Sequence, residues 1–257
     1  MKIRGYLALV FICLGFVVMD LYQRFVVALR ARLQPRRRTA ILARWIQWMA
    51  TFVMGSLRRI GGASLPRPQS VVPCEPGVLI IMNHQSLLDI PLVVQSVDEG
   101  YPRIVTRARY HRFIPLISHM VRLYQYPVVD PSANPRALMA SLAELRREAR
   151  ESEVPIAIFP EGTRTRDGEI GRFRKRGLDQ ILSTRDWKVY VFVADGFWKT
   201  ARFKDFLKGM DDLDGRMAFL GCLDWPDPEA ETEPFIEELR AMMTRGLEEL
   251  RREVVRA

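Results

Sequence analysis

Apolar residues along the chain form two kinds of pattern. Two short uninterrupted apolar runs, 78–82 and 156–159, each end abruptly in a polar turn. Continuous rather than alternating runs are typical of strands that are buried on both faces of a sheet. Longer segments with apolar residues at helical spacing include 135–150 and 233–252. The pattern predicts an α/β fold, with a mixed, mostly parallel sheet of about seven strands flanked by helices.

The turn after the first run carries residues suited to proton transfer. It contains Asn83, His84 and Ser86, and Asp89 follows the histidine by five positions. Pro91 fits only the first turn of a helix, which predicts a helix start near Asp89. Imidazole can remove and return a proton near neutral pH, and a carboxylate on its far nitrogen fixes the tautomer. From these residues alone, the alternative is that Asp89 is a helix N-cap and His84 an ordinary turn residue.

The turn after the second run, 160–164, offers groups that can hold an anion. Gly162 allows the backbone to approach a ligand closely or to take a positive φ angle. Arg164 presents a planar fork of donors suited to a phosphate or a carboxylate, and Lys175 further along adds a point charge. The alternative from spacing alone is a surface turn with a Glu–Arg ion pair.

The first 60 residues form a segment that is both apolar and basic. Residues 1–60 hold eleven Lys and Arg against one acid, Asp20, whereas the remainder has a net charge of −1. Residues 5–19 are uncharged and would span roughly 22 Å as a helix, short of the ~30 Å hydrocarbon thickness. An arginine-rich turn around Pro35 precedes a second apolar segment, 41–57. We expect a membrane-associated helical pair, either a hairpin in one leaflet or a shallow span with an interfacial helix.

The charge pattern of this segment also predicts where the chain resides. Arginines beside apolar segments favour the cytoplasmic side and attract anionic headgroups. We therefore expect the cytoplasmic face of the inner (plasma) membrane, with an anionic bilayer surface as a partner. A cleaved signal peptide is disfavoured because no small-residue cleavage site follows the apolar region. Nucleic-acid binding is disfavoured because the arginines punctuate lipid-length apolar segments. A soluble helical subdomain is the remaining alternative.

The remaining residues, 61–257, have the length of one α/β domain, which the chain enters through a Gly- and Pro-rich linker at 61–76. The three cysteines, Cys13, Cys74 and Cys222, are scattered and show no metal-ligand spacing. Their odd number suggests a reducing compartment. With three histidines in the whole chain, we expect no metal site.

The two turns together resemble a known family. In the first turn, Asn83 comes directly before His84-x4-Asp89. Residues 159–165, at the second turn, have the sequence FPEGTRT. In this order the two stretches are similar to blocks I and III of the glycerolipid acyltransferases. These are the 1-acyl-sn-glycerol-3-phosphate acyltransferases and their relatives. Either block alone is a modest signal, but the pair in this order is specific. The resemblance covers roughly residues 60–230, and identifies 61–257 as an α/β acyltransferase domain.

The resemblance implies a mechanism and a set of site residues. His84 would be the general base on a lysolipid hydroxyl, oriented by Asp89, and the oxygen would attack the thioester of acyl-CoA or acyl carrier protein without an acyl-enzyme. No cofactor or metal is implied; the acyl thioester is a co-substrate. The residues expected to contact substrate are Asn83, Arg109, Glu161, Gly162, Thr163, Arg164 and Lys175.

The sequence departs from the family in its other blocks. The second block ends in Asp130-Pro131, without the arginine that the family assigns to the acceptor phosphate, and Arg122 or Arg136 could substitute. Arg107 or Arg109 stands where the family has a lysine. We expect 1-acylglycerol-3-phosphate as acceptor, giving phosphatidic acid. The alternatives are another lysophospholipid, a lyso-aminolipid, or a homologue that only binds lipid or hydrolyses thioesters.

Overall fold

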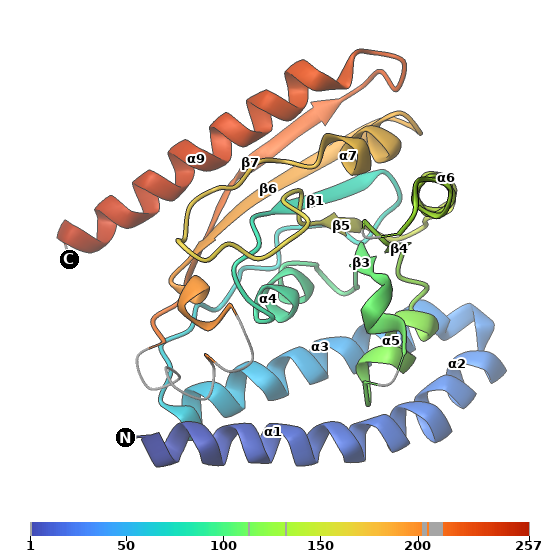
Figure 1. Ribbon diagram of the computed structural model, residues 1–257. Coiled ribbons are helices and arrows are strands. Elements are labelled where there is room, and N and C mark those ends of the chain that lie inside the picture. The colour runs from blue at the N-terminus through green and yellow to red at the C-terminus, as the bar shows by residue number, and fades with distance from the viewer. Residues whose placement is uncertain (1, 113, 132, 202–204, 206–212, 257) are drawn as a thin grey trace.

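The computed structural model describes residues 2–112, 114–131, 133–201, 205 and 213–256. Helices and strands stack in layers around a central sheet (Figure 1). The strands are β1 (Val78–Met82), β2 (Arg103–Ile104), β3 (Thr106–Arg107), β4 (Val128–Val129), β5 (Ile156–Ile158), β6 (Trp187–Asp195) and β7 (Arg216–Trp225). The α-helices are α1 (Lys2–Tyr22), α2 (Ala28–Leu33), α3 (Arg38–Ser56), α4 (Asp89–Gln95), α5 (Ile117–Leu123), α6 (Pro135–Glu151), α7 (Lys175–Leu182) and α9 (Thr232–Arg256). Short 3-10 or π segments are η1 (Gln23–Val27), η2 (Pro35–Arg37), η3 (Leu57–Gly61), η4 (Ala108–His111) and η5 (Phe197–Thr200).

The main sheet has the order β2-β5-β1-β6-β7, with parallel neighbours except for the antiparallel pair β6–β7. This confirms the predicted mixed, mostly parallel sheet. The expected single sheet of about seven strands is, however, divided, because β3 and β4 pair separately. The division occurs where the Val105 amide still bonds to Ala157 O at 2.9 Å but the Thr106 amide turns to Pro127 O at 2.8 Å.

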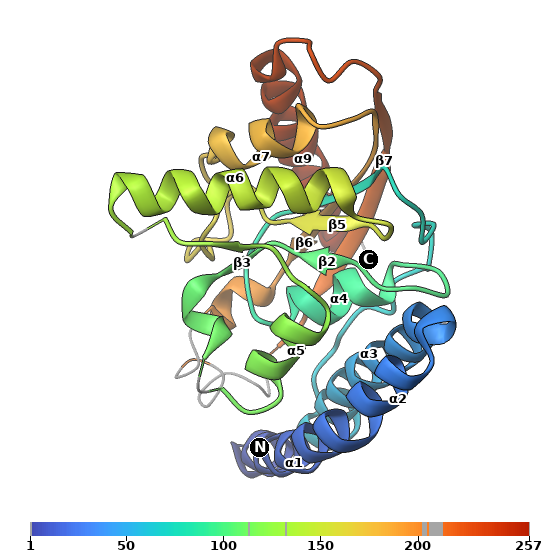
Figure 2. The ribbon, with the colours of Figure 1, turned by 90° about the vertical axis from the view of Figure 1, so that its right-hand side faces the viewer.

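Strand β1 lies in the middle of the sheet and is buried along its whole length. Leu79 and Ile81 point into the core under α6, α7 and α9, whereas Val78, Ile80 and Met82 point into the core shared with α3, α4 and α5. Figure 2 shows these two groups of helices on opposite sides of the sheet. Burial on both faces explains why the strand reads as a continuous apolar run.

The N-terminal helical pair comprises residues 2–61. The stretch through α1, η1 and α2 runs along the bottom of the molecule in Figure 1, and α3 with η3 returns antiparallel to it. The helical stretch Ile3–Leu33 is long and apolar enough to cross a membrane by length and composition. Many of its large apolar side chains are exposed, namely Ile3, Tyr6, Leu7, Val10, Phe11, Leu14, Val17, Val18, Leu21, Tyr22, Phe25, Leu29 and Leu33.

Two polar residues of this apolar stretch attach it to the α/β part. Asp20 Oδ1 accepts a hydrogen bond from the Leu116 amide at 2.8 Å, and Gln23 Nε2 donates to Leu116 O at 3.3 Å. Leu116 has a φ angle of 64°, a strained conformation for a branched side chain. Gln23 is fully buried and also bonds to Trp45 Nε1 at 3.0 Å and to His119 Nδ1 at 2.9 Å. Asp20, the acid that interrupts the apolar segment, therefore helps to hold this helix against the α/β part of the chain.

We expect Gln23→Leu to lower the free energy of unfolding by about 1–3 kcal/mol, because it removes the hydrogen-bond partner of the partly buried Trp45 indole and of Leu116 O. Thermal unfolding in detergent measures the change. Leu21→Ala is the matched control, since Leu21 is 54% exposed on the same helix. Equal thermal midpoints for Gln23→Leu and Leu21→Ala would contradict this docking role.

Candidate active site

The two turns singled out in the sequence meet at one edge of the sheet. Strands β1, β5 and β6 are parallel neighbours, so their carboxyl ends lie together. The first turn follows β1 and leads into α4, and the second follows β5. This edge is where open α/β sheets place ligands and chemistry.

His84 and Asp89 form a hydrogen-bonded pair. The distance from His84 Nδ1 to Asp89 Oδ2 is 2.8 Å, and the Asp89 side chain is fully buried while that of His84 is 18% exposed. The same Oδ2 accepts from the amides of Gln85 at 2.6 Å and Ser86 at 2.8 Å. Asp89 thus binds the turn that precedes it rather than capping the amides of α4, which is the alternative that the sequence left open. With Nδ1 bonded to the carboxylate, Nε2 is the ring nitrogen left for a substrate.

The imidazole is also fixed from the side of the second turn. The ring of His84 stacks on that of Phe159, with centroids 4.3 Å apart and an interplanar angle of 19°. The His84 amide donates to Glu161 Oε1 at 3.2 Å, and His84 O accepts from the Thr165 amide at 2.8 Å. Ring and backbone of the histidine are therefore both held by residues 159–165.

Glu161 lines the cavity described below, and its carboxylate also connects the two turns. Its side chain is buried, and it accepts from the backbone amides of His84 and Gly171. Burial raises the pKa of this carboxyl to about 7, against the lowering effect of those two hydrogen bonds. The residue thus joins the two turns at the edge of the cavity.

Asn83 differs from its predicted substrate contact. It is fully buried, and its side-chain amide pairs with the backbone of Ala194 on β6. Asn83 Nδ2 donates to Ala194 O at 2.9 Å, and Asn83 Oδ1 accepts from Ala194 N at 2.7 Å. The side chain continues the β1–β6 hydrogen bonding beyond the end of β1, and both of its polar groups are used in doing so.

Gly162 and Lys175 have contacts that their predicted roles did not include. Gly162 has a φ angle of 63°, and an added Cβ would lie 2.7 Å from Arg174 Cδ, so only glycine fits. Its carbonyl accepts from Arg107 Nε at 3.0 Å.

Lys175 borders the cavity described below, but its ammonium pairs with Glu233 at 2.5 Å and Glu237 at 2.9 Å on α9. The positive charge of Lys175 is thus paired with carboxylates of α9.

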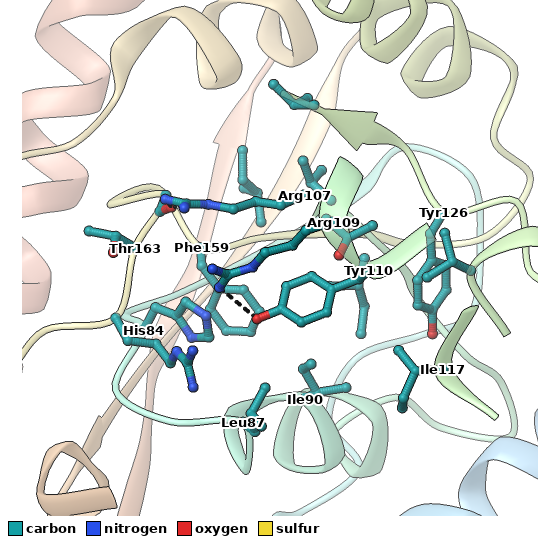
Figure 3. A pocket seen from close by; sticks show the side chains of 18 of the residues that line it. His84, Leu87, Ile90, Arg107, Arg109, Tyr110, Ile117, Tyr126, Phe159 and Thr163 are labelled. Atoms are coloured by element: carbon teal, nitrogen blue, oxygen red, sulfur yellow. Dashed lines mark hydrogen bonds between the residues drawn. The ribbon is translucent and has the colours of Figure 1, made fainter. Parts of the chain in front are cut away.

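A cavity of about 1480 Å³ opens beside His84. This exceeds the roughly 300–1,000 Å³ typical of small-molecule sites. Apolar side chains from α1, α3, α4, α5 and α6 line most of it. Figure 3 shows the side chains of Arg107 and Arg109 toward the end where His84 and Thr163 lie, with Ile117 and Tyr126 further along. The cavity is thus apolar for most of its extent and cationic next to the histidine.

The cations at this end come from several segments. Those lining the cavity are Arg107, Arg109, Arg164, Arg166, Arg172, Arg174, Lys175 and Arg176. Burial and the nearby charges of Arg109, Arg174 and Arg164 lower the pKa of Arg107. Arg164 Nη1 is buried without a hydrogen-bond partner within the described part of the chain. Both observations favour an anionic ligand at this end.

The predicted replacements for the missing second-block arginine do not reach this cavity. Arg122 donates to His111 O at 2.8 Å, and Arg136 is exposed on α6; neither lines the cavity. Arg107 and Arg109 do line it. Arg107 of β3 and Arg109 of η4 therefore join the cations of the second turn and of residues 172–176 at this end of the cavity.

Sequence reasoning missed Gln85. Its fully buried amide accepts from Phe197 N at 3.1 Å and Trp198 N at 3.2 Å, and donates to Gly168 O and to Asp195. Arg251 of α9 holds Asp195 from the other side, with Nε 3.0 Å from Oδ2. A glutamine in a polar turn carries no sequence signal for such a network, because its four partners are distant in the chain.

A metal would need a cluster of ligating side chains. Among the residues that the structure describes, no group of three or more His, Cys, Asp or Glu is placed to hold one.

Comparisons with known proteins agree with this architecture. A protein-family model described as Acyltransferase matches residues 64–194. The chain is 28% identical over 137 residues to a 1-acyl-sn-glycerol-3-phosphate acyltransferase of Cocos nucifera, covering 53% of this chain and 41% of that protein. It is 31% identical over 97 residues to one of Limnanthes douglasii, covering 38% and 34%. The matches thus span less than half the length of these curated relatives.

A solved structure extends the similarity to the whole chain. The 1-acyl-sn-glycerophosphate (LPA) acyltransferase PlsC from Thermotoga maritima superposes with a TM-score of 0.74. The match covers 98% of both chains at 22% sequence identity, so it shows that the fold is shared, including the N-terminal helices.

We expect the wild-type protein to lose roughly 3 kcal/mol of stability as the pH rises from about 4.5 to about 7, owing to Glu161. Its pKa is raised in the folded state, so its contribution is complete below the unfolded pKa and is lost as the pH passes the folded pKa. Glu161→Gln should lack this slope, and should be less stable at low pH because its amide group meets a backbone N–H.

Thermal unfolding of both proteins between pH 4 and 8 tests this expectation. Glu229→Gln, at an exposed position, is the matched control. Parallel pH profiles for Glu161→Gln and wild type would exclude a raised pKa at this carboxyl.

Proposed function

Since the chain belongs to the acyltransferase family, we propose that it transfers a fatty acyl group from acyl-CoA or acyl carrier protein to the hydroxyl of a lysophospholipid. The first acceptor we propose is 1-acylglycerol-3-phosphate, which would give phosphatidic acid. The names of the two curated relatives support this acceptor. The family itself is the one that the two turns predicted.

The reaction assigns the proton transfers to His84. Nε2 takes the proton of the acceptor hydroxyl, and the oxygen attacks the thioester carbonyl carbon. When the carbon–sulfur bond breaks, the thiolate leaves and receives that proton from the imidazolium. Asp89, 2.8 Å from Nδ1, holds the tautomer and stabilises the charged ring. The acyl group passes directly between substrates, and we expect no metal or cofactor to take part.

The single observation that carries this proposal is the placement of the His84–Asp89 pair. It lies where a long apolar cavity meets a group of arginines. An acyl chain suits the apolar part, and a phosphate suits the arginines beside the histidine. Thr163 and Arg164 from the second turn, with Arg107 and Arg109 from the β3 region, line that end and are the proposed head-group contacts.

We expect His84→Ala to reduce acyl transfer by about 10²- to 10⁴-fold, because the general base is lost. The measurement is the initial rate of acylated product from acyl-CoA and 1-acylglycerol-3-phosphate in membranes. His111→Ala is the matched control, since that histidine does not line the cavity. Transfer by His84→Ala at the wild-type rate would remove the mechanism.

The same assay, run with a panel of acceptors, separates the other functions. Acylated lysophosphatidic acid, another acylated lysolipid or lyso-aminolipid, and free fatty acid are distinct products. Free fatty acid formed without acylated lipid would indicate thioester hydrolysis, and no product from any combination would indicate a lipid-binding role.

We also propose that residues 1–60 attach the α/β acyltransferase domain, 61–257, to the cytoplasmic face of the inner membrane. The exposed apolar side chains along Ile3–Leu33 would be solvated by lipid. The flanking arginines, among them Arg30, Arg32 and Arg36, would meet anionic headgroups. Because α1 and α3 also line the cavity, a lipid acceptor would enter it from the bilayer side.

Substitution of exposed residues tests attachment better than deletion, because deletion would also uncover core residues that pack against these helices, such as Val94 of α4 and Met120 of α5. We expect Val10→Glu with Leu14→Glu and Val18→Glu to lower the fraction that sediments with anionic phospholipid vesicles. Met139→Glu, at a 61% exposed position on α6, is the control. Unchanged sedimentation of the triple variant would contradict attachment through this face.

A further inference from the structure

A second, smaller hollow adjoins the main cavity. It measures about 270 Å³ and is lined by Arg166, Trp198, Lys199, Ala201 and Asp205. Arg166 and Ala201 line the main cavity as well, so the hollow lies next to it on the other side of these residues. A long ligand whose reacting end lies at His84 could therefore extend into the hollow.

The Trp198 ring in this hollow is held in a fixed position. The Trp198 amide donates to Gln85 Oε1 at 3.2 Å, which ties it to the residue next to His84. Gly168 lies against the indole, with a φ angle of 85°, and a Cβ there would come within 2.7 Å of the ring. Only glycine allows this approach, so the loop after the second turn is shaped to receive the indole.

Charged groups surround this aromatic ring. Lys199 Nζ lies 6.0 Å from the Trp198 ring centroid, and Arg166 is exposed at the boundary between the two spaces. An indole face stacks on a planar base, and cations pair with phosphate oxygens. The combination matches an adenine nucleotide.

We propose that this hollow binds the adenine nucleotide of coenzyme A, with its base on Trp198 and its phosphates at Arg166 and Lys199. The proposal rests on the proposed acyl transfer and specifies its donor. Acyl-CoA and acyl carrier protein share the phosphopantetheine arm, so the nucleotide is what distinguishes them. A carrier protein offers no base to stack.

The test compares two donors that differ by the nucleotide, acyl-CoA and acyl-4′-phosphopantetheine. We expect Trp198→Ala to raise KM for acyl-CoA by about tenfold, from the loss of one stacking contact, and to leave kcat/KM for acyl-phosphopantetheine unchanged. Trp198→Phe should keep most of the wild-type KM because it retains an aromatic face. Lys199→Ala should act like Trp198→Ala, and Lys188→Ala, at an exposed position near the other end of β6, should not.

Equal loss with both donors would mean that Trp198 only supports the turn at Gln85, and would overturn the proposal. Unchanged KM values, or a wild-type protein active with acyl carrier protein but not with acyl-CoA, would also overturn it. Calorimetry with adenosine 3′,5′-bisphosphate gives an independent readout, with binding expected for wild type and lost in Trp198→Ala. If this binding is seen but no donor supports acyl transfer, the proposed function fails and the nucleotide site stands.

Discussion

The position of His84 depends on hydrogen bonds made by its own backbone to a turn far along the chain. Glu161 accepts from its amide and the Thr165 amide donates to its carbonyl, while Phe159 stacks on its ring. Parallel pairing of β1 with β5 brings these segments together. Because three kinds of contact converge on one residue, the imidazole is held in one orientation relative to Asp89 without needing a substrate to place it.

A second network fixes the other side of the same turn. The amide of Gln85 joins the start of η5, the Gly168 loop and Asp195, and Arg251 extends this network to the C-terminal helix. The Gln85 side chain is fully buried, so its amide group requires partners, and the turn cannot shift without breaking several hydrogen bonds at once. The C-terminal helix α9 therefore contributes to the geometry at His84, although it packs on the face of the sheet opposite to α4.

The N-terminal helices are part of the cavity as well as the surface proposed to meet lipid. Residues of α1 and α3 line its apolar end, and Asp20 and Gln23 hold the strained Leu116, which also lines it. The apolar exterior and the apolar cavity share the same two helices. For the lipid acceptor proposed above, this arrangement would let the substrate pass from one apolar environment to another.

The sequence alone determined the fold class, the buried strands and the two turns, because continuous apolar runs and the residues that end them are local signals. It also determined the family, through the order of its two blocks. It could not determine that Asn83 and Glu161 bond to backbone amides, that Lys175 pairs with α9, or that Gln85 bonds to four residues distant in the chain. Those outcomes depend on which polar groups become buried beside one another, and only the tertiary structure, which brings residues distant in the chain together, decides that.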